Sequence, residues 1–153
     1  MYEALDIAKY IVASYWKQGE AITNLKLQKI LYYIQGYAYR NCRSAAFKDQ
    51  ICKWPYGPVV PAVYYQYSSF RAGPIAEPKD EDIKRVALRL SENNTMKNVI
   101  DRVISVSYQY TSTQLVRMTH AENPWKYTIG MDTIISKSDI GLYFSSNDPL
   151  NLE

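Results

Sequence analysis

Apolar residues recur every three or four positions over the N-terminal part of the chain, which is the spacing of one face of an α-helix. This pattern predicts a first helix that ends at Gly19 and a second that begins at Thr23 or Asn24, since either side chain can cap a helix. The inward positions of the two helices are Leu5, Ala8, Ile11, Val12, Tyr15 and Trp16, then Leu27, Ile30, Leu31, Ile34 and Ala38. The other face of the second helix carries Lys26, Lys29 and Tyr33, which we expect to be exposed.

The helical spacing is lost between Ala45 and Val60. Three prolines and a glycine lie within Trp54-Pro55-Tyr56-Gly57-Pro58-Val59-Val60-Pro61, and no continuous helix tolerates that composition. We predict a short strand or hairpin arm near Gln50 to Lys53, followed by a rigid turn. Pro61 suits the first turn of a third helix, which would extend to Gly73.

Further helices are predicted in the second half of the chain. Asp80, Glu81 and Asp82 favour a helix start, because carboxylates there oppose the positive end of the helix dipole. The candidate caps of the later helices are Thr95, Ser112 and Ser136, the last with Asp139 placed for a capping box. The pattern predicts a mainly α, compact single-domain fold of residues 1–153, with about six to seven helices and one small β element. We expect its core between about residues 5 and 144 and a frayed polar tail from Ser145.

Composition narrows the class of protein. The net charge of +3 is mild and spread over 153 residues, whereas obligate nucleic-acid binders concentrate their basic residues. No apolar run reaches membrane-spanning length, and Asp6 and Lys9 interrupt the apolar stretch that a signal peptide needs, so we expect a cytoplasmic protein that makes no membrane contact. One histidine with Cys42 and Cys52 indicates no metal site, and singly scattered glycines indicate no phosphate-binding loop. We therefore expect no cofactor.

Candidate catalytic chemistry is confined to Thr119-His120-Ala121-Glu122. The imidazole of His120 could pair with the carboxylate of Glu122 as an acid/base unit. Alternatively, His120 ends a short helix and bonds its carbonyls, while Glu122 and Trp125 hold the following turn. We favour the second interpretation because no further catalytic group lies nearby in the sequence, and we assign no catalytic residue.

Three blocks of sequence together resemble a known family. They are Thr23-Asn24-Leu25-Lys26-Leu27-Gln28-Lys29-Ile30-Leu31-Tyr32-Tyr33, the Trp54 to Pro61 block followed by Val63-Tyr64, and Thr119-His120-Ala121-Glu122-Asn123-Pro124-Trp125. Their order and spacing, with a closing helix from Ile135 to Phe144, are similar to those of the Panacea domain, found in SocA-like antitoxins and phage-associated GepA-like proteins. Pro55 departs from the pattern, which has a charged or polar residue there.

The resemblance implies an antitoxin of a toxin–antitoxin system, which neutralises a cognate toxin by direct protein–protein binding. It also allows a second mode, in which the chain is an adaptor that delivers its toxin to a protease. A DNA-binding autoregulator is a third hypothesis, based on a helix after Ser112 that could imitate a helix-turn-helix. Against it, no recognition helix rich in Arg, Asn and Gln follows. None of these functions requires an active site.

Candidate partner contacts combine aromatic and basic side chains. The chain has 15 tyrosines, and tyrosine is enriched in interface cores. The candidates are Lys26, Lys29, Tyr33, Trp54, Tyr56, Tyr65 and Arg71. Structural roles are expected for Leu27 in the core, for Gly57 and Pro58 in the turn, and for His120, Glu122 and Trp125 in the third block. Trp54 and Trp125 are either core residues that hold the turns or exposed anchors, and we favour the core.

Overall fold

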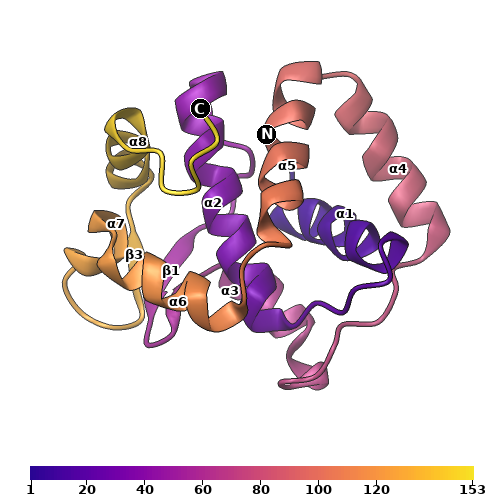
Figure 1. Cartoon of the computed structure of the whole chain (residues 1–153), viewed down its shortest axis with the longest axis horizontal. Coiled ribbons are helices and arrows are strands. Elements are labelled where there is room, and N and C mark those ends of the chain that lie inside the picture. Colours follow the sequence, from indigo (N-terminus) through magenta and orange to yellow (C-terminus); the bar gives the residue numbers. More distant parts are fainter.

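α2 (Asn24–Cys42) is the central element of the structure. The computed structural model describes all 153 residues, and in it α2 packs against α1 (Ala4–Lys17), α3 (Pro61–Gln66), α5 (Asn94–Ser107), α6 (Ser112–Ala121) and α8 (Lys137–Ser146) (Figure 1). The other elements are α4 (Asp80–Ser91), α7 (Asn123–Lys126), the 3-10 helix η1 (Ser68–Phe70) and three short strands. The predicted mainly α fold with a small β element is confirmed, with eight α-helices instead of six or seven.

The polar side of α2 is covered as completely as its apolar side. Every residue from Leu27 to Ala38 is buried, as predicted for Leu27 and the rest of the apolar stripe. The expectation that Lys29 and Tyr33 are exposed is wrong, since their exposed fractions are 0% and 1%. The reason is that β2, α6 and α8 also pack on this helix. Periodicity separates a polar face from an apolar one, but it does not indicate what covers the polar face.

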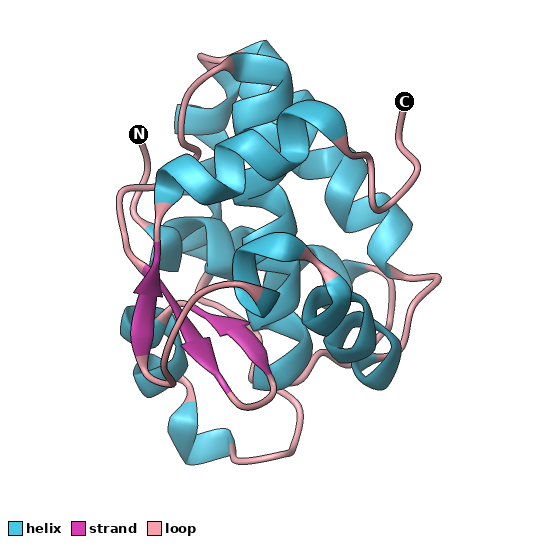
Figure 2. Ribbon diagram, turned by 90° about the vertical axis from the view of Figure 1, so that its left-hand side faces the viewer, coloured by secondary structure: helices cyan, strands magenta, loops and turns pink.

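The strands form one small antiparallel sheet in the order β2–β1–β3. β1 (Ile51–Trp54) is the strand predicted near Gln50 to Lys53, and β2 (Gly57–Val59) returns after a tight turn. Cys52 lies opposite Val59 on one side and Ile134 on the other. β3 (Thr133–Ile135) was not predicted, because three residues are too few to show an alternating pattern. Figure 2 shows the sheet at one side of the helical body.

Most helix starts lie within two residues of their predicted positions. Thr23 caps α2, and Ser136 caps α8 by accepting the Asp139 N–H. The caps predicted at Thr95 and Ser112 are wrong: Asn93 caps α5, and Thr111 caps α6 through a reciprocal capping box with Gln114. Each of these starts contains adjacent residues that can all cap, so local chemistry does not choose among them. The third helix is also shorter than predicted, since α3 ends at Gln66 and η1 follows.

Two predictions about burial need correction. Trp16 was placed in the core, but it is 46% exposed, and its indole N–H donates to the Ile75 carbonyl. The tail was expected to fray, but Leu150 is 3% exposed and belongs to the hydrophobic core. Its N–H donates to the Tyr37 hydroxyl, which in turn donates to Asp148. Asp148 also accepts the backbone N–H groups of Leu152 and Glu153, so burial of Leu150 and these hydrogen bonds together hold the tail in place.

No helix combines the length and the apolar character that crossing a bilayer would require.

Candidate functional site

The three sequence blocks, far apart along the chain, meet on one side of α2. Lys29 on α2 donates to the Pro58 carbonyl in β2, with 3.0 Å between nitrogen and oxygen. The hydroxyls of Tyr32 and Tyr33 donate to the two carboxylate oxygens of Glu122, at 3.0 and 2.7 Å. Hydrogen bonds from side chains of α2 therefore join this helix to both the hairpin and the α6–α7 junction.

Glu122 is a buried carboxylate whose two partners are tyrosines. It is 4% exposed, and burial raises its pKa to about 7, although the two tyrosine hydrogen bonds oppose that shift. Burial and the nearby carboxylate raise the pKa of Tyr32 and Tyr33 well above the ordinary tyrosine value. Both carboxylate oxygens are used by tyrosine hydroxyls, so the acid/base pair considered for His120 and Glu122 is not assembled.

His120 is held by stacking. Its ring lies 4.1 Å from the Trp125 ring with an interplanar angle of 27°, and its Nε2 is buried without a hydrogen-bond partner. The expectation that this imidazole bonds the helix carbonyls is therefore wrong. Trp125 does hold the turn, because its indole N–H donates to the Trp54 carbonyl at 2.9 Å. The ammonium of Lys53 lies over the same indole, 4.3 Å from its centroid.

At Gly57 the hairpin approaches α2 and α6 closely. Its φ is +111°, and a Cβ there would lie 2.6 Å from Cε of Lys29 and 2.8 Å from Oγ1 of Thr119. The special backbone conformation and the close approach expected of Gly57 are thus both present. Lys29 is fully buried beneath this turn, and burial lowers its pKa to about 7.

Beside this turn lies a partly exposed surface of aromatic side chains and one arginine, which we call the hairpin face: Trp54, Tyr56, Tyr64, Tyr65 and Arg71. Trp54 and Tyr64 are half-buried, and the other three are exposed. Tyr56 and Tyr65 are 69% and 65% exposed. The Trp54 ring makes edge contacts with Tyr64 and Tyr65, at centroid distances of 4.9 and 5.9 Å. An open cavity of about 310 Å³ lies within this surface, lined by Asn24, Leu25, Gln28, Trp54, Pro55, Tyr56, Val59, Tyr64, Arg71 and Ala72.

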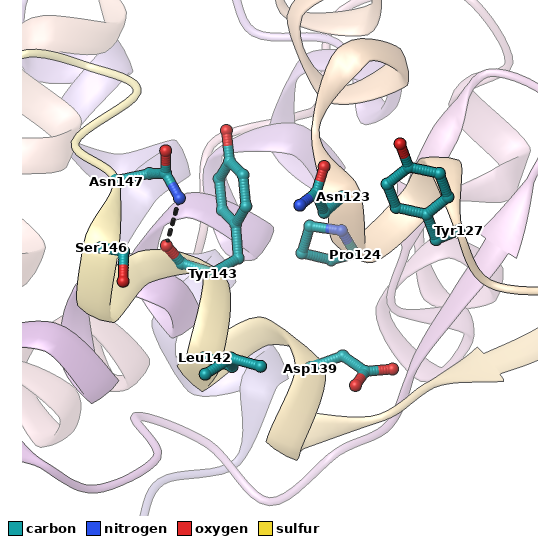
Figure 3. Close-up of a pocket in the computed structure, with 8 residues that line it drawn as sticks. All are labelled: Asn123, Pro124, Tyr127, Asp139, Leu142, Tyr143, Ser146 and Asn147. Atoms are coloured by element: carbon teal, nitrogen blue, oxygen red, sulfur yellow. Dashed lines mark hydrogen bonds between the residues drawn. The ribbon is translucent and has the colours of Figure 1, made fainter.

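A second group of exposed apolar residues lies in the segment that links α7 to α8 and on α8 itself. We call it the α7–α8 group; it comprises Tyr127, Ile129, Met131, Ile134 and Leu142, and Ile129 is 92% exposed. Asn123, Pro124 and Tyr127 on one side and Asp139, Leu142 and Tyr143 on the other line a groove of about 330 Å³ between α7 and α8 (Figure 3). Trp54 joins this segment to the hairpin, since its indole N–H donates to Asp132 at 3.0 Å.

The predicted partner contacts separate into accessible and inaccessible residues. Tyr56, Tyr65 and Arg71 are exposed, and Trp54 is half-buried at the rim of the cavity. Lys26 is half-buried, with its ammonium 5.3 Å from the Tyr15 ring centroid. Lys29 and Tyr33 are enclosed and cannot meet a partner on this surface.

Sequence reasoning missed two features of this side of the molecule. It did not assign Tyr64 to the surface, and the Tyr64-Tyr65 pair alone was no sufficient signal, because the adjacent pair Tyr32-Tyr33 is buried. It also missed the α7–α8 group, whose residues show no helical or strand periodicity. Trp54 and Trp125 were expected in the core, and both are half-buried.

Comparison with known proteins gives one match. No curated protein and no solved structure matches the chain. The family model described as antitoxin SocA-like, Panacea domain matches residues 27–126, which is more than half of the chain. The match begins on α2, contains the hairpin and ends with α7, so it includes the residues that meet at Glu122 and Gly57. The chain therefore belongs to the antitoxin SocA-like, Panacea domain family.

Proposed function

We propose that this protein is an antitoxin that neutralises its cognate toxin by binding it directly, through the hairpin face. The observation that carries the proposal is the aromatic cluster of the hairpin face, in a member of an antitoxin family. Tyr56 and Tyr65 are exposed, and Tyr56 and the half-buried Trp54 line an open cavity. Tryptophan, tyrosine and arginine are the residues most enriched among those that dominate protein–protein binding energy. The hairpin face combines all three.

The hairpin face is built on a rigid support, which favours tight binding. Its turn contains Pro55, Pro58 lies in β2, and the hydrogen bond from Trp125 to the Trp54 carbonyl fixes the end of β1 next to the turn. Side chains that are already ordered lose less conformational entropy when a partner binds, so more of the contact energy remains as affinity. The buried hydrogen bonds of Lys29 and Glu122 would then hold in place the elements that carry the binding surface.

Catalysis, DNA binding and the adaptor mode have less support than direct neutralisation. Neutralisation by occupancy needs no reacting group, and the carboxylate of Glu122 is engaged by tyrosines, which supports a structural role for it. For DNA binding, the helix that follows α6 would have to enter a groove, but α7 has four residues. The adaptor mode remains the alternative, because it also begins with toxin binding.

The test is co-expression with the toxin encoded beside this gene. We expect growth rescue and co-purification of the two proteins. The double variant Tyr56→Ser/Tyr65→Ser should weaken binding by about thirtyfold or more, the effect of losing an aromatic anchor worth ~2 kcal/mol. The matched control is Leu88→Ser on α4. Leu88 is 66% exposed, much like the two tyrosines, and this variant should bind as the wild type does.

Two outcomes would contradict the proposal. Rescue without a complex at micromolar concentrations would exclude direct neutralisation. Rescue that requires a host protease, with toxin levels falling when the antitoxin is present, would indicate the adaptor mode.

A further inference from the structure

Most of the residues that line the cavity in the hairpin face are apolar. Trp54 and Tyr64 stand edge to face with ring centroids 4.9 Å apart, and the other apolar lining residues are Leu25, Pro55, Tyr56, Val59 and Ala72. The volume of about 310 Å³ compares with roughly 30 Å³ for one water molecule in the liquid. One large side chain from a partner can therefore enter without rearranging the hairpin.

The polar side chains that line this cavity bond to their own chain. The Gln28 carbonyl oxygen accepts the Val60 N–H, and the Gln28 amide donates to the Asn24 side chain. The Asn24 amide in turn donates to the Tyr64 carbonyl at 3.0 Å. Because these groups are already paired, the cavity offers little hydrogen bonding to an incoming polar group, and it favours an apolar one.

Arg71 is the one charged residue among those that line the cavity, and no carboxylate accompanies it. It is exposed, and it takes part in none of the ion pairs of the structure. Its backbone has φ +54° and ψ −126°, a conformation that favours glycine, at the end of η1. A non-glycine residue in such a conformation is a recognised feature of binding and catalytic sites. The positive charge thus stands free at the rim of an apolar cavity.

We infer that the hairpin face recognises an acidic–apolar segment of the toxin. A large apolar side chain of that segment enters the cavity, and a neighbouring aspartate or glutamate pairs with Arg71. This inference rests on the proposed function, and it adds the chemistry of the partner. Charge complementarity indicates that the residue next to the apolar side chain is acidic. A basic residue there would be repelled by Arg71, and no acidic residue of the cavity lining would offset that repulsion.

The first experiment uses the whole ¹⁵N-labelled chain and three acetylated heptapeptides. The probe is Ser-Gly-Asp-Phe-Glu-Gly-Ser; one comparison peptide has lysine in place of both acidic residues, and the other has serine in place of phenylalanine. We expect the probe to shift the Trp54 indole N–H signal and to bind about fivefold more tightly than the lysine peptide, as exposed ion pairs allow. The Arg71→Gln variant should remove that difference. Equal shifts with all three peptides, or none with any, would overturn the inference.

The second experiment measures the affinity of the complex with an inactivated toxin. Ala72→Trp, which fills the cavity from an exposed lining position, and Arg71→Glu should each weaken binding by about tenfold. Ala76→Trp adds the same bulk to an exposed position outside the lining and should change nothing. Thermal melts verify that each variant is folded.

The outcomes separate this inference from the proposed function. A toxin that binds the wild type, Ala72→Trp and Arg71→Glu equally would overturn the inference and leave direct neutralisation in place. A toxin that does not bind the wild type would overturn the proposed function, and the peptides would still decide what the cavity accepts.

Discussion

At the residue scale, Lys29 and Glu122 are charge-bearing side chains that are buried in this protein. An ionised group is expensive to remove from water unless it is paired, so a buried lysine or glutamate shifts its pKa toward the neutral form. Lys29 has one acceptor, the Pro58 carbonyl, and its pKa is lowered to about 7. Glu122 has two tyrosine donors, and its pKa is raised to about 7. Each residue makes the free energy of unfolding depend on pH, and the two dependences have opposite signs.

Lys29 and Glu122 should produce a minimum in stability near pH 7. Between pH 7 and about 10, the unfolded chain holds a proton on Lys29 that the folded chain has released, so stability rises with pH by up to about 1.4 kcal/mol per pH unit. Between about pH 4.5 and 7, the folded chain holds the extra proton on Glu122, so stability falls as pH rises. Denaturant unfolding at several pH values should show that Lys29→Met removes the alkaline slope and Glu122→Gln the acidic one. Curves parallel to the wild type would contradict these assignments.

Gly57→Val should be more harmful than a glycine substitution at a comparable backbone angle elsewhere. Positive φ alone costs a β-branched residue about 1–3 kcal/mol, and Gly19, with φ +71° and open space around it, has such a cost without a steric clash. At Gly57 the new side chain must also displace Lys29 and Thr119, so we expect at least ~1 kcal/mol more than for Gly19→Val. If the two variants lost equal free energy of unfolding, Lys29 and Thr119 would move away from the new side chain at no cost.

His120→Gln should leave neutralisation intact. The change removes a stack on Trp125 worth about 0.5–1.5 kcal/mol and breaks no hydrogen bond of Nε2, which has no partner. Growth rescue is measured at matched soluble expression, with thermal melts alongside. A stable, toxin-binding His120→Gln protein that no longer rescues growth would instead assign this imidazole a chemical role.

At the scale of elements, the starts of α2, α5, α6 and α8 are each capped by one side chain, and at α5 and α6 neighbouring residues could also serve as the cap. α6 illustrates this: Thr111 and Ser112 are adjacent, both can cap, and the sequence does not distinguish them. The structure selects Thr111 because its extended backbone lets its side chain accept the Gln114 N–H, while the Gln114 side chain accepts the Thr111 N–H. The choice matters for the site, since α6 delivers Thr119 to Gly57 and leads into Glu122.

Thr111→Ala should therefore cost about 1 kcal/mol of stability, the usual effect of removing a helix cap. Ser112→Ala is the matched control and should lie within about 0.5 kcal/mol of the wild type, because Ser112 already lies inside the helix. Chemical denaturation distinguishes the two variants. A larger loss for Ser112→Ala would place the cap where the sequence pattern first suggested.

At the scale of the whole molecule, distant segments converge on α2. The hairpin, the α6–α7 junction, α8 and the tail all pack on it or bond to its side chains. The tail completes this arrangement, because Leu150 enters the core while Asp148 accepts the Tyr37 hydroxyl. Such a support keeps the hairpin face ordered, which would lower the entropy cost of binding a partner there.

Leu150→Ala should cost about 2–5 kcal/mol, as expected when a buried leucine is truncated and leaves a cavity. Leu142→Ala provides the comparison, because Leu142 is 72% exposed and should change stability by no more than about 0.5 kcal/mol. Both are measured by denaturant unfolding. If Leu150→Ala lowered the free energy of unfolding as little as we expect for Leu142→Ala, the tail would be dispensable for stability.

The sequence by itself determined the features whose signals are local. The apolar stripe of α2, the acidic start of α4, the turn after β1 and the need for glycine at position 57 all follow from side-chain spacing or backbone sterics within a few residues. The order of the three blocks also sufficed to identify the family, because a family pattern depends on residue types and spacing and not on contacts.

Only the tertiary structure decided which polar residues are accessible. Lys29, Tyr33 and Glu122 are as polar as Lys26, Tyr65 and Arg71, yet the first three are enclosed and the others are at least partly accessible. Exposure depends on which distant elements cover a face, and here β2, α6 and α8 cover the polar side of α2. The cavity of the hairpin face arises in the same way, since the first helix residues of α2, the hairpin and the segment after η1 enclose it together. Such a site has no signal within any single segment, because each segment contributes only one wall.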